Sequence, residues 1–212
     1  MHFDLIHCDI WGAYYVKSFC GASYFLTILD DASRCVWVYL MREKSEASQI
    51  VKDFCAMVQT QFKTKVRTIR SDNGSEFVSG PMKNFYGEQE IIHETSSVDT
   101  PQQNGRVERK HRHVLNVARA LRFEAHLRLE FWGECVLTVA HLINRTPTQV
   151  LNGKTPYEAL FGTKPSYEHL KFVDVCVMHT ICKEKRTNLV QEVEGAFLLV
   201  IHMGKRVGRF TI

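Results

Sequence analysis

Three acidic residues stand at the boundaries of predicted elements. Asp9 lies near the end of an apolar, strand-like segment, Asp72 follows another such segment, and Glu108 lies in the first turns of a predicted helix. The intervening residues 73–107 number 35. Carboxylates from different elements can converge where strand ends meet the start of a helix. Such a convergence builds the oxygen-rich kind of site that Mg²⁺ prefers.

The chemistry open to such a site is phosphoryl transfer. Mg²⁺ takes few protein ligands and keeps positions for water and phosphate oxygens. Two such ions, about 3.5–4 Å apart, can hold the attacking and leaving oxygens of an in-line displacement. A site of this kind needs neither a protein nucleophile nor an organic cofactor.

Each acid also has an ordinary structural explanation. Asp72 precedes Asn73 and Gly74, and its side chain can accept a backbone N–H of its own turn. Glu108 near a helix N-terminus favours the helix dipole. Asp9 can pair with a lysine. Residue types alone therefore leave both explanations open for each acid.

The elements around the acids follow from apolar periodicity. Strands are predicted over 3–10, 23–31, 34–41, 66–70 and 91–94, and helices over 45–63, 81–89, from 106 onward and over 130–142. Residues 96–105 are loop-like in composition, and residues 172–212 carry strand-like runs between lysines and arginines. This order predicts an α/β fold with a mixed five-stranded sheet flanked by helices.

Composition limits the classes of protein to consider. The chain has 212 residues, 45% of them hydrophobic, a net charge of +4 and a pI near 8.7, which permits but does not require a nucleic-acid partner. Seven widely spaced cysteines without a CxxC pair predict reduced thiols and disfavour a zinc finger. We find no membrane-length apolar run and no signal peptide, so we expect an intracellular protein that is not secreted and contacts no membrane.

Clustered motifs along the chain resemble one known family. In order, they are DLIHCDIWG, SYFLTILDD, SRCVWVYL, IRSDNGSEF, TPQQNGRVERKHR, FWGE, LINRTP and GKTPYEALFGTKP. Together they resemble the integrase catalytic core of copia-type LTR retrotransposons, within the retroviral integrase superfamily. The resemblance implies an RNase H-like core over residues 1–165, followed by a divergent extension over 166–212.

The resemblance also implies an activity and its residues. Asp9, Asp72 and Glu108 match the family's catalytic triad, which binds two Mg²⁺ or Mn²⁺ ions in the presence of DNA. The implied reaction is strand transfer, in which a 3′-hydroxyl of the element DNA attacks a target phosphodiester. Asp9 would bridge both ions. Implied partners are element and target DNA and further copies of the chain, and the implied location is the nucleus.

Polar residues beside Glu108 are candidates for DNA contacts, although a solvated helix face explains them as well. They are Gln102, Gln103, Asn104, Arg106, Arg109, Lys110 and Arg112. Other residues are predicted to be structural. We expect His111 to be semi-buried, Trp132 to anchor a helix on the core, and Asp30-Asp31 to form a hairpin turn.

Two alternative functions remain beside the integrase. One is a truncated or domesticated remnant that binds nucleic acid without catalysis, because the zinc-binding domain, protease and reverse transcriptase of such elements do not accompany this core. The other is an RNase H-type hydrolase, which does not account for the TPQQNGRVER segment. The sequence departs from the family at Ala13 and Arg128, where proline is usual, and at Glu90, where glycine is usual.

Overall fold

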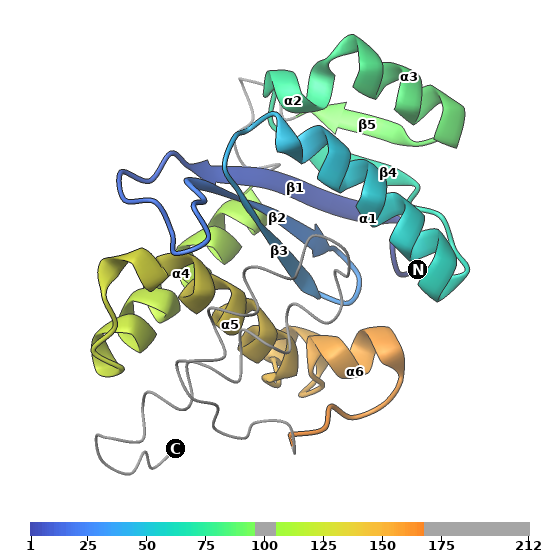
Figure 1. Cartoon of the computed structure of the whole chain (residues 1–212). Helices are drawn as coiled ribbons and strands as arrows, with labels where there is room; N and C mark the ends of the chain where they lie inside the picture. Colours follow the sequence, from blue (N-terminus) through green and yellow to red (C-terminus); the bar gives the residue numbers. More distant parts are fainter. Residues whose placement is uncertain (96–104, 168–212) are drawn as a thin grey trace.

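A mixed five-stranded sheet lies at the centre of the protein (Figure 1). The computed structural model describes residues 1–95 and 105–167. The strands are β1 (Leu5–Gly12), β2 (Tyr24–Asp30), β3 (Val36–Met41), β4 (Thr68–Ser71) and β5 (Ile92–Thr95). Their order across the sheet is β3-β2-β1-β4-β5; β1, β2 and β3 pair antiparallel, whereas β4 pairs parallel to both β1 and β5.

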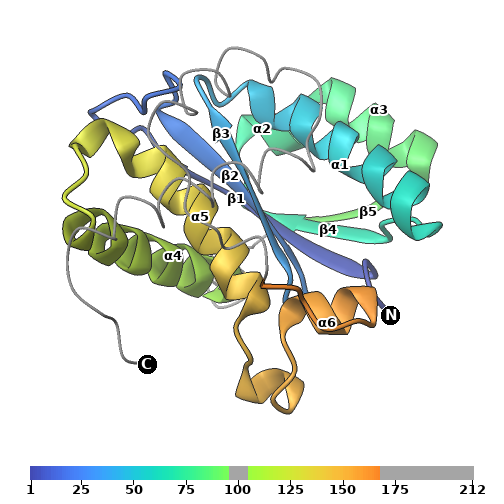
Figure 2. The same ribbon diagram turned by 60° about the horizontal axis from the view of Figure 1, so that its bottom comes forward.

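Helices cover both faces of the sheet, which explains why β2 is an almost continuous apolar run (Figure 2). Alternate residues of β2 point into two separate cores. Leu26 and Ile28 belong to the core on one face, and Phe25 and Leu29 belong to the core on the other.

The first core lies beneath the helices α1, α2, α3 and α6. These are α1 (Glu46–Phe62), α2 (Ser75–Val78), α3 (Gly80–Gln89) and α6 (Pro156–Phe161). Helix α1 buries one face of its 17 residues through Ala47, Val51, Phe54 and Val58. That spacing is the helical period, so the amphipathic pattern of the sequence places α1 against the sheet.

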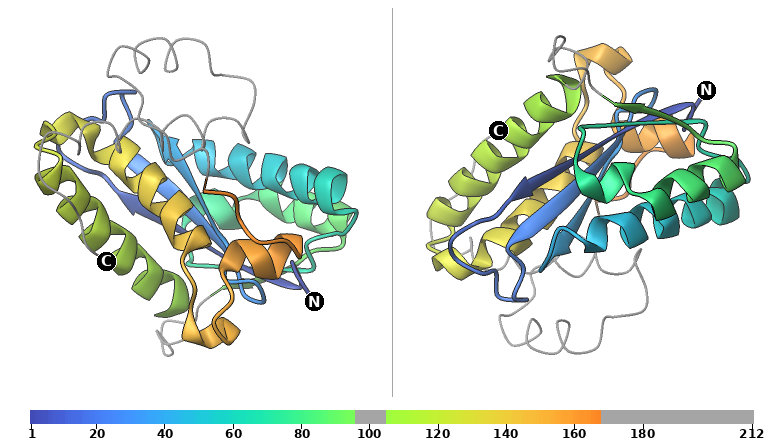
Figure 3. Two further views of the ribbon diagram at one scale, coloured as in Figure 1. Left: turned by 90° about the horizontal axis from the view of Figure 1, so that it is seen from below. Right: turned by 90° about the horizontal axis from the view of Figure 1, so that it is seen from above.

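The second core lies beneath α4 and α5, which run side by side in both views of Figure 3. They are α4 (Gly105–Glu124) and α5 (Trp132–Arg145), joined by the short 3₁₀ helix η2 (Leu129–Phe131); η3 (Gln149–Leu151) follows α5. Trp132 packs against the rings of Trp11 and Tyr14 and donates Nε1–H to the Val16 carbonyl at 2.8 Å. The predicted anchoring role of Trp132 is therefore confirmed.

The predicted fold class and all five predicted strands are confirmed. Two short helices, α2 and α6, were not predicted from the sequence. Asp30 and Asp31 lie at the predicted hairpin turn, and the buried Asp30 carboxylate accepts hydrogen bonds from the Phe3 and Ser33 amides and the Ser33 hydroxyl. The strand-like runs predicted over 172–212 lie outside the described residues, as does almost all of the predicted extension.

The state of the cysteines and the length of the helices can be compared with the predictions made from the sequence. Cys8, Cys35, Cys55 and Cys135 carry free thiols, so the prediction is confirmed for these four. Cys20 is disulfide-bonded, so the prediction of reduced thiols is wrong for that residue. In the described part of the chain, no helix is both long and apolar enough to cross a membrane.

Candidate active site

The sheet brings Asp9 and Asp72 to neighbouring positions. Strands β1 and β4 are parallel, with Leu5 opposite Thr68 and His7 opposite Arg70. Continuing this register by two residues places Asp72, the first residue after β4, opposite Asp9. Neighbouring strands lie about 4.8 Å apart. Two acids that are separated in sequence by 62 residues, 10–71, therefore become lateral neighbours.

The Asp72 carboxylate has two roles in its turn. Its Oδ1 accepts the backbone N–H of Gly74 at 3.1 Å, so the structural explanation offered by the sequence also holds. Burial raises the pKa of Asp72 above its ordinary value; the Gly74 N–H offsets part of this, and the charges of Asp9 and Glu76 add to it. The raised pKa shows that the ionised carboxylate lacks sufficient positive compensation.

Asp9 is held by its own strand and by α4. Its Oδ1 accepts the Ile10 amide N–H at 3.0 Å, and its Oδ2 lies 3.1 Å from His111 Nδ1. The His111 ring is buried and meets the ring of Phe25 edge to face at 5.3 Å. Thr27, the cross-strand partner of Asp9, is completely buried. Two polar atoms beside Asp9, Thr27 Oγ1 and His111 Nε2, are buried without a hydrogen-bond partner among the described residues.

Glu108 lies one helical turn before the residue that contacts Asp9. Residues three apart on a helix are neighbours on its surface, so Glu108 and His111 share one side of α4. Glu108 is exposed in the first turn of the helix. Contact between His111 and Asp9 therefore brings Glu108 to the side of the two aspartates, with its side chain exposed to solvent.

The donor set suits a hard divalent cation. Asp9 and Asp72 present carboxylate oxygens on adjacent strands, and their mutual repulsion contributes to the raised pKa of Asp72. A cation between them would remove that repulsion. Within residues 1–95 and 105–167, no three His, Cys, Asp or Glu side chains are grouped closely enough to form a metal site. The acids thus stand as a pair, with Glu108 one turn of α4 away from the Asp9 contact.

The structure divides the predicted DNA contacts between two sides of α4. Arg109 and Arg112 are exposed. Arg106 is also exposed but forms an ion pair with Asp31. Lys110 is partly buried, with its pKa lowered by burial and by the charge of Arg34. Residues 102–104, which include the three predicted amide contacts, lie outside the described residues.

Asp31 contacts His7, Arg34 and Arg106, and the contact with Arg106 attaches the start of α4 beside the sheet. Its Oδ1 lies 2.9 Å from His7 Nε2 and 3.3 Å from Arg34 Nη1, and it also contacts Arg106. Burial raises the pKa of Asp31, but hydrogen bonds from Arg106 and His7 bring it below the ordinary value. Helix α4 is thereby attached at Asp31 through Arg106 and at Asp9 through His111, with Glu108 between the two attachments.

The contact between His111 and Asp9 is the site feature that sequence reasoning missed. The burial of His111 was predicted, but its partner depends on how α4 packs across the sheet.

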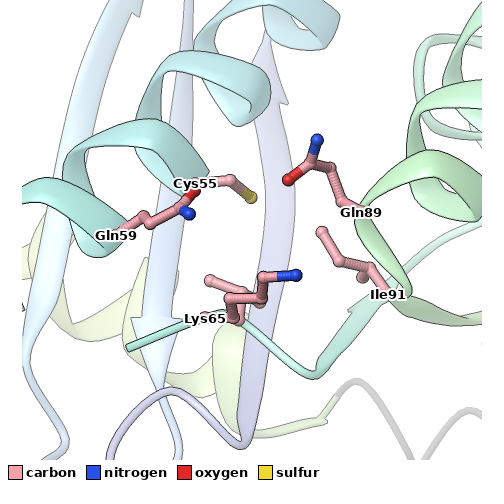
Figure 4. Close-up of a pocket in the computed structure, with 6 residues that line it drawn as sticks. Cys55, Gln59, Lys65, Gln89 and Ile91 are labelled. Carbon is pink, nitrogen blue, oxygen red and sulfur yellow. The ribbon is translucent and has the colours of Figure 1, made fainter. Parts of the chain in front are cut away.

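A distinct shallow pocket lies between α1 and the end of α3, lined by Cys55, Gln59, Lys65, Val66, Gln89 and Ile91 (Figure 4). None of the three acids lines this pocket, so the candidate chemistry lies elsewhere.

A mixed sheet with this order and helices on both faces defines an RNase H-like fold. Solved structures that share the fold include two integrase cores. One is the catalytic core domain of BIV integrase (TM-score 0.55, 19% identity, 75% of this chain and 94% of that chain covered). The other is the HTLV-2 integrase catalytic core domain in complex with magnesium, in a trimeric form (TM-score 0.54, 18% identity, 74% and 95% covered).

Sequence relatives identify the family. Residues 2–101 match the integrase core domain. The chain is 36% identical over 186 residues to the retrovirus-related Pol polyprotein from transposon TNT 1-94 of Nicotiana tabacum. It is 33% identical over 168 residues to the corresponding polyprotein from transposon RE2 of Arabidopsis thaliana. These matches cover 88% and 79% of this chain but only 14% and 11% of the polyproteins. The chain contains an integrase core domain of the retrotransposon type, and the resemblance seen in its sequence is confirmed.

Proposed function

We propose that this chain is the catalytic core of a retrotransposon integrase, a metal-dependent polynucleotidyl transferase that joins element DNA 3′ ends to target DNA. The observation that carries this proposal is the parallel register of β1 and β4, which sets Asp9 beside Asp72. The raised pKa of Asp72 supports it, because two neighbouring carboxylates gain from a shared cation.

The roles of the chain's own residues follow from their positions. Asp9 within β1 and Asp72 directly after β4 would hold Mg²⁺ or Mn²⁺, and Glu108 would add a third carboxylate from α4. Bound as a pair with DNA, the ions supply charge stabilisation for the attacking and leaving oxygens. His111 fixes the Asp9 carboxylate through Nδ1, and the turn at Gly74 fixes that of Asp72. Arg109 and Arg112 provide exposed positive charge for phosphates beside Glu108.

Partners and location belong to the same proposal. The structural relatives are integrase cores, and one of them is described in a trimeric form with magnesium. We infer that this core acts as a homo-oligomer on element and target DNA, and that it works in the nucleus, where target DNA lies.

One observation favours the alternative of a non-catalytic nucleic-acid-binding remnant. Glu108 is exposed, and within the described residues it joins no three-acid cluster. In a remnant, the positive surface of α4 would still bind DNA, while the acids would serve the turn and the helix. This alternative makes a different prediction for metal-dependent chemistry.

A strand-transfer and disintegration assay separates the two functions. The chain is incubated with labelled element-end DNA and a disintegration substrate in Mn²⁺ or Mg²⁺. We expect metal-dependent products from the parent chain, and a loss of at least 100-fold in Asp72→Asn and Glu108→Gln, because each removes one charged ligand. Asp53→Asn, on the exposed side of α1, is the matched control. Retained DNA binding without any metal-dependent product from the parent would refute catalysis and favour the remnant.

A further inference from the structure

The net positive charge of this chain is matched by that of α4 alone. The helix contains six lysines and arginines and two glutamates, a net charge of +4 (6 − 2), and the whole chain also carries +4. The rest of the chain is therefore balanced. A helix that holds all of the net charge over about 30 Å is a strong electrostatic feature for a polyanion.

Five of the exposed residues of α4 lie along one stripe of the helix. They recur at helical spacing and are Arg109, Arg112, Asn116, Arg119 and Phe123. At about 100° per residue, Arg112, Arg119 and Phe123 lie within about 60° of Glu108 around the helix axis, whereas Arg106 and Lys110 lie on the opposite side. The stripe therefore begins beside the candidate active site and continues away from it to the last turn of α4.

Aromatic rings stand exposed where the stripe ends. Phe123 is 65% exposed, and the Arg122 guanidinium lies 4.4 Å from its ring centroid. Tyr15, in the loop between β1 and β2, is 81% exposed, with its ring 4.8 Å from that of Tyr14. Arg119 lies close enough to act on the pKa of Tyr14. Packing of Tyr14 against Trp132, with ring centroids 5.4 Å apart, holds this loop against α5 next to α4.

We propose that Arg119, Phe123 and Tyr15, here called the α4 platform, bind DNA beyond the reacting phosphate and stack an unpaired base. Arginine supplies phosphate-directed charge, and exposed rings supply flat surfaces that accept any base. The combination fits nucleic acid better than an acidic protein, which would engage the arginines but leave the rings in water. The inference deepens the proposed function, because the bound DNA is the one whose phosphate meets Asp9 and Asp72.

For DNA that runs along α4 from Glu108, as this proposal requires, the length of the helix sets the position of the stacked base. Glu108 and Phe123 are 15 positions apart, which corresponds to about 22 Å along the axis. At about 3.4 Å per base step, this span is about six steps from the reacting phosphate. The platform therefore addresses DNA that carries an unpaired end or overhang at that distance.

Metal-free binding tests the platform without requiring catalysis. Anisotropy in EDTA compares blunt duplex with duplex that carries 2-aminopurine in an overhang, scanned five to eight steps from the end. We expect Tyr15→Leu or Phe123→Leu to weaken overhang binding about tenfold and abolish 2-aminopurine quenching, whereas Tyr15→Phe and Phe123→Tyr preserve both. Arg119→Gln should lower the slope of log affinity against log salt by about 0.7–0.9.

Controls and outcomes keep this inference separate from the proposed function. Arg67→Gln and Phe161→Leu change exposed residues of the same types away from α4, and both should bind as the parent does. Leucine variants that quench 2-aminopurine like the parent, or an unchanged salt slope in Arg119→Gln, would overturn the platform even if strand transfer works. Altered binding in a chain without strand transfer would support the platform and refute only catalysis. If the parent chain binds none of these DNAs, the platform proposal is overturned as well, and a protein becomes the partner to test for this surface.

Discussion

Glu134 is a buried acid whose titration should control the stability of the fold. It lies in the first turn of α5 and is only 3% exposed. Its Oε1 lies 3.3 Å from the Cys20 sulfur, and its Oε2 has no hydrogen-bond partner among the described residues. Burial raises the pKa of Glu134 to about 7, with a smaller contribution from Glu130, while its own backbone N–H opposes the rise.

The sign and size of the effect follow from linkage. The folded state binds the Glu134 proton more tightly than the unfolded state, whose ordinary pKa is 4.5. The stabilisation that comes from protonated Glu134 is therefore lost as the pH rises from 4.5 to about 7. Above that range this contribution to the free energy of unfolding is gone. At about 1.36 kcal/mol per pKa unit, a difference of about 2.5 corresponds to a loss of about 3 kcal/mol.

The variant Glu134→Gln should remove this dependence, because its amide is neutral at every pH. We expect the variant to be more stable than the parent by up to about 3 kcal/mol at pH 8, or roughly 6–12 °C in Tm, and the difference to vanish towards pH 4.5. His141, whose pKa burial lowers to about 3, produces an opposite slope in acid, but it is common to both proteins and cancels in the difference.

Urea unfolding at constant ionic strength between pH 4.5 and 8 measures the difference directly. A matched variant, Glu130→Gln, changes a neighbouring acid that is only half-buried and should track the parent closely. If the stability difference between Glu134→Gln and the parent does not change with pH, the carboxyl does not titrate as a buried group. A variant that is less stable than the parent at pH 8 would also refute the reasoning.

Three further substitutions probe the site and the sheet. Gly74→Ala would place a Cβ 2.8 Å from the Glu76 carboxyl group and 3.0 Å from Asp72 Oδ1. Strand transfer should therefore fall at least tenfold, while Tm stays within about 3 °C of the parent. Full activity would contradict this. His111→Ala should raise the Mn²⁺ concentration required for activity about 10–100-fold. His111→Asn retains a donor towards Asp9 and should stay near the parent. Equal behaviour of the two variants would rule out a positioning role for His111. Asn144→Ala leaves the N–H and C=O of Val36 unpaired at the edge of β3 and should cost about 1–3 kcal/mol in urea unfolding, and no loss would show that water replaces the amide.

The sheet was predictable because its pattern is local. Continuous apolar runs such as that of β2 indicate strands covered on both faces, and the spacing of Ala47, Val51, Phe54 and Val58 indicates a helix. The short helix α2 was missed because Asn73 and Gly74 favour a turn, and the helix begins immediately after that turn. Helix α6 is also short, but its N-cap, in which the Thr155 hydroxyl oxygen accepts the Glu158 N–H, was a readable signal in the sequence.

The candidate site was only partly predictable, because its geometry is non-local. Sequence placed Asp72 directly after a strand and Asp9 near the end of another, although β1 continues to Gly12. The neighbouring positions of the two acids depend on the parallel pairing of β1 with β4. The contact of His111 with Asp9 depends on how α4 crosses the sheet, which no periodicity specifies. Likewise, the charges on Arg106 and Asp31 were visible in the sequence, but their pairing was not.

The attachments of α4 explain why one helix can combine structure with substrate binding. Arg106 and His111 fix its first two turns to Asp31 and Asp9, and Val107, Val114 and Ala118 bury its inner face. These contacts use the side of the helix that faces the sheet, so the arginines on the outer side remain exposed to solvent. Since Glu108 lies between the fixed side and the exposed side, any DNA drawn along the outer arginines passes the acids. A rotation of α4 would therefore disturb the Asp9 contact and the DNA path together. We accordingly expect defects in metal use and in DNA binding to appear together when the Arg106–Asp31 or His111–Asp9 contact is broken.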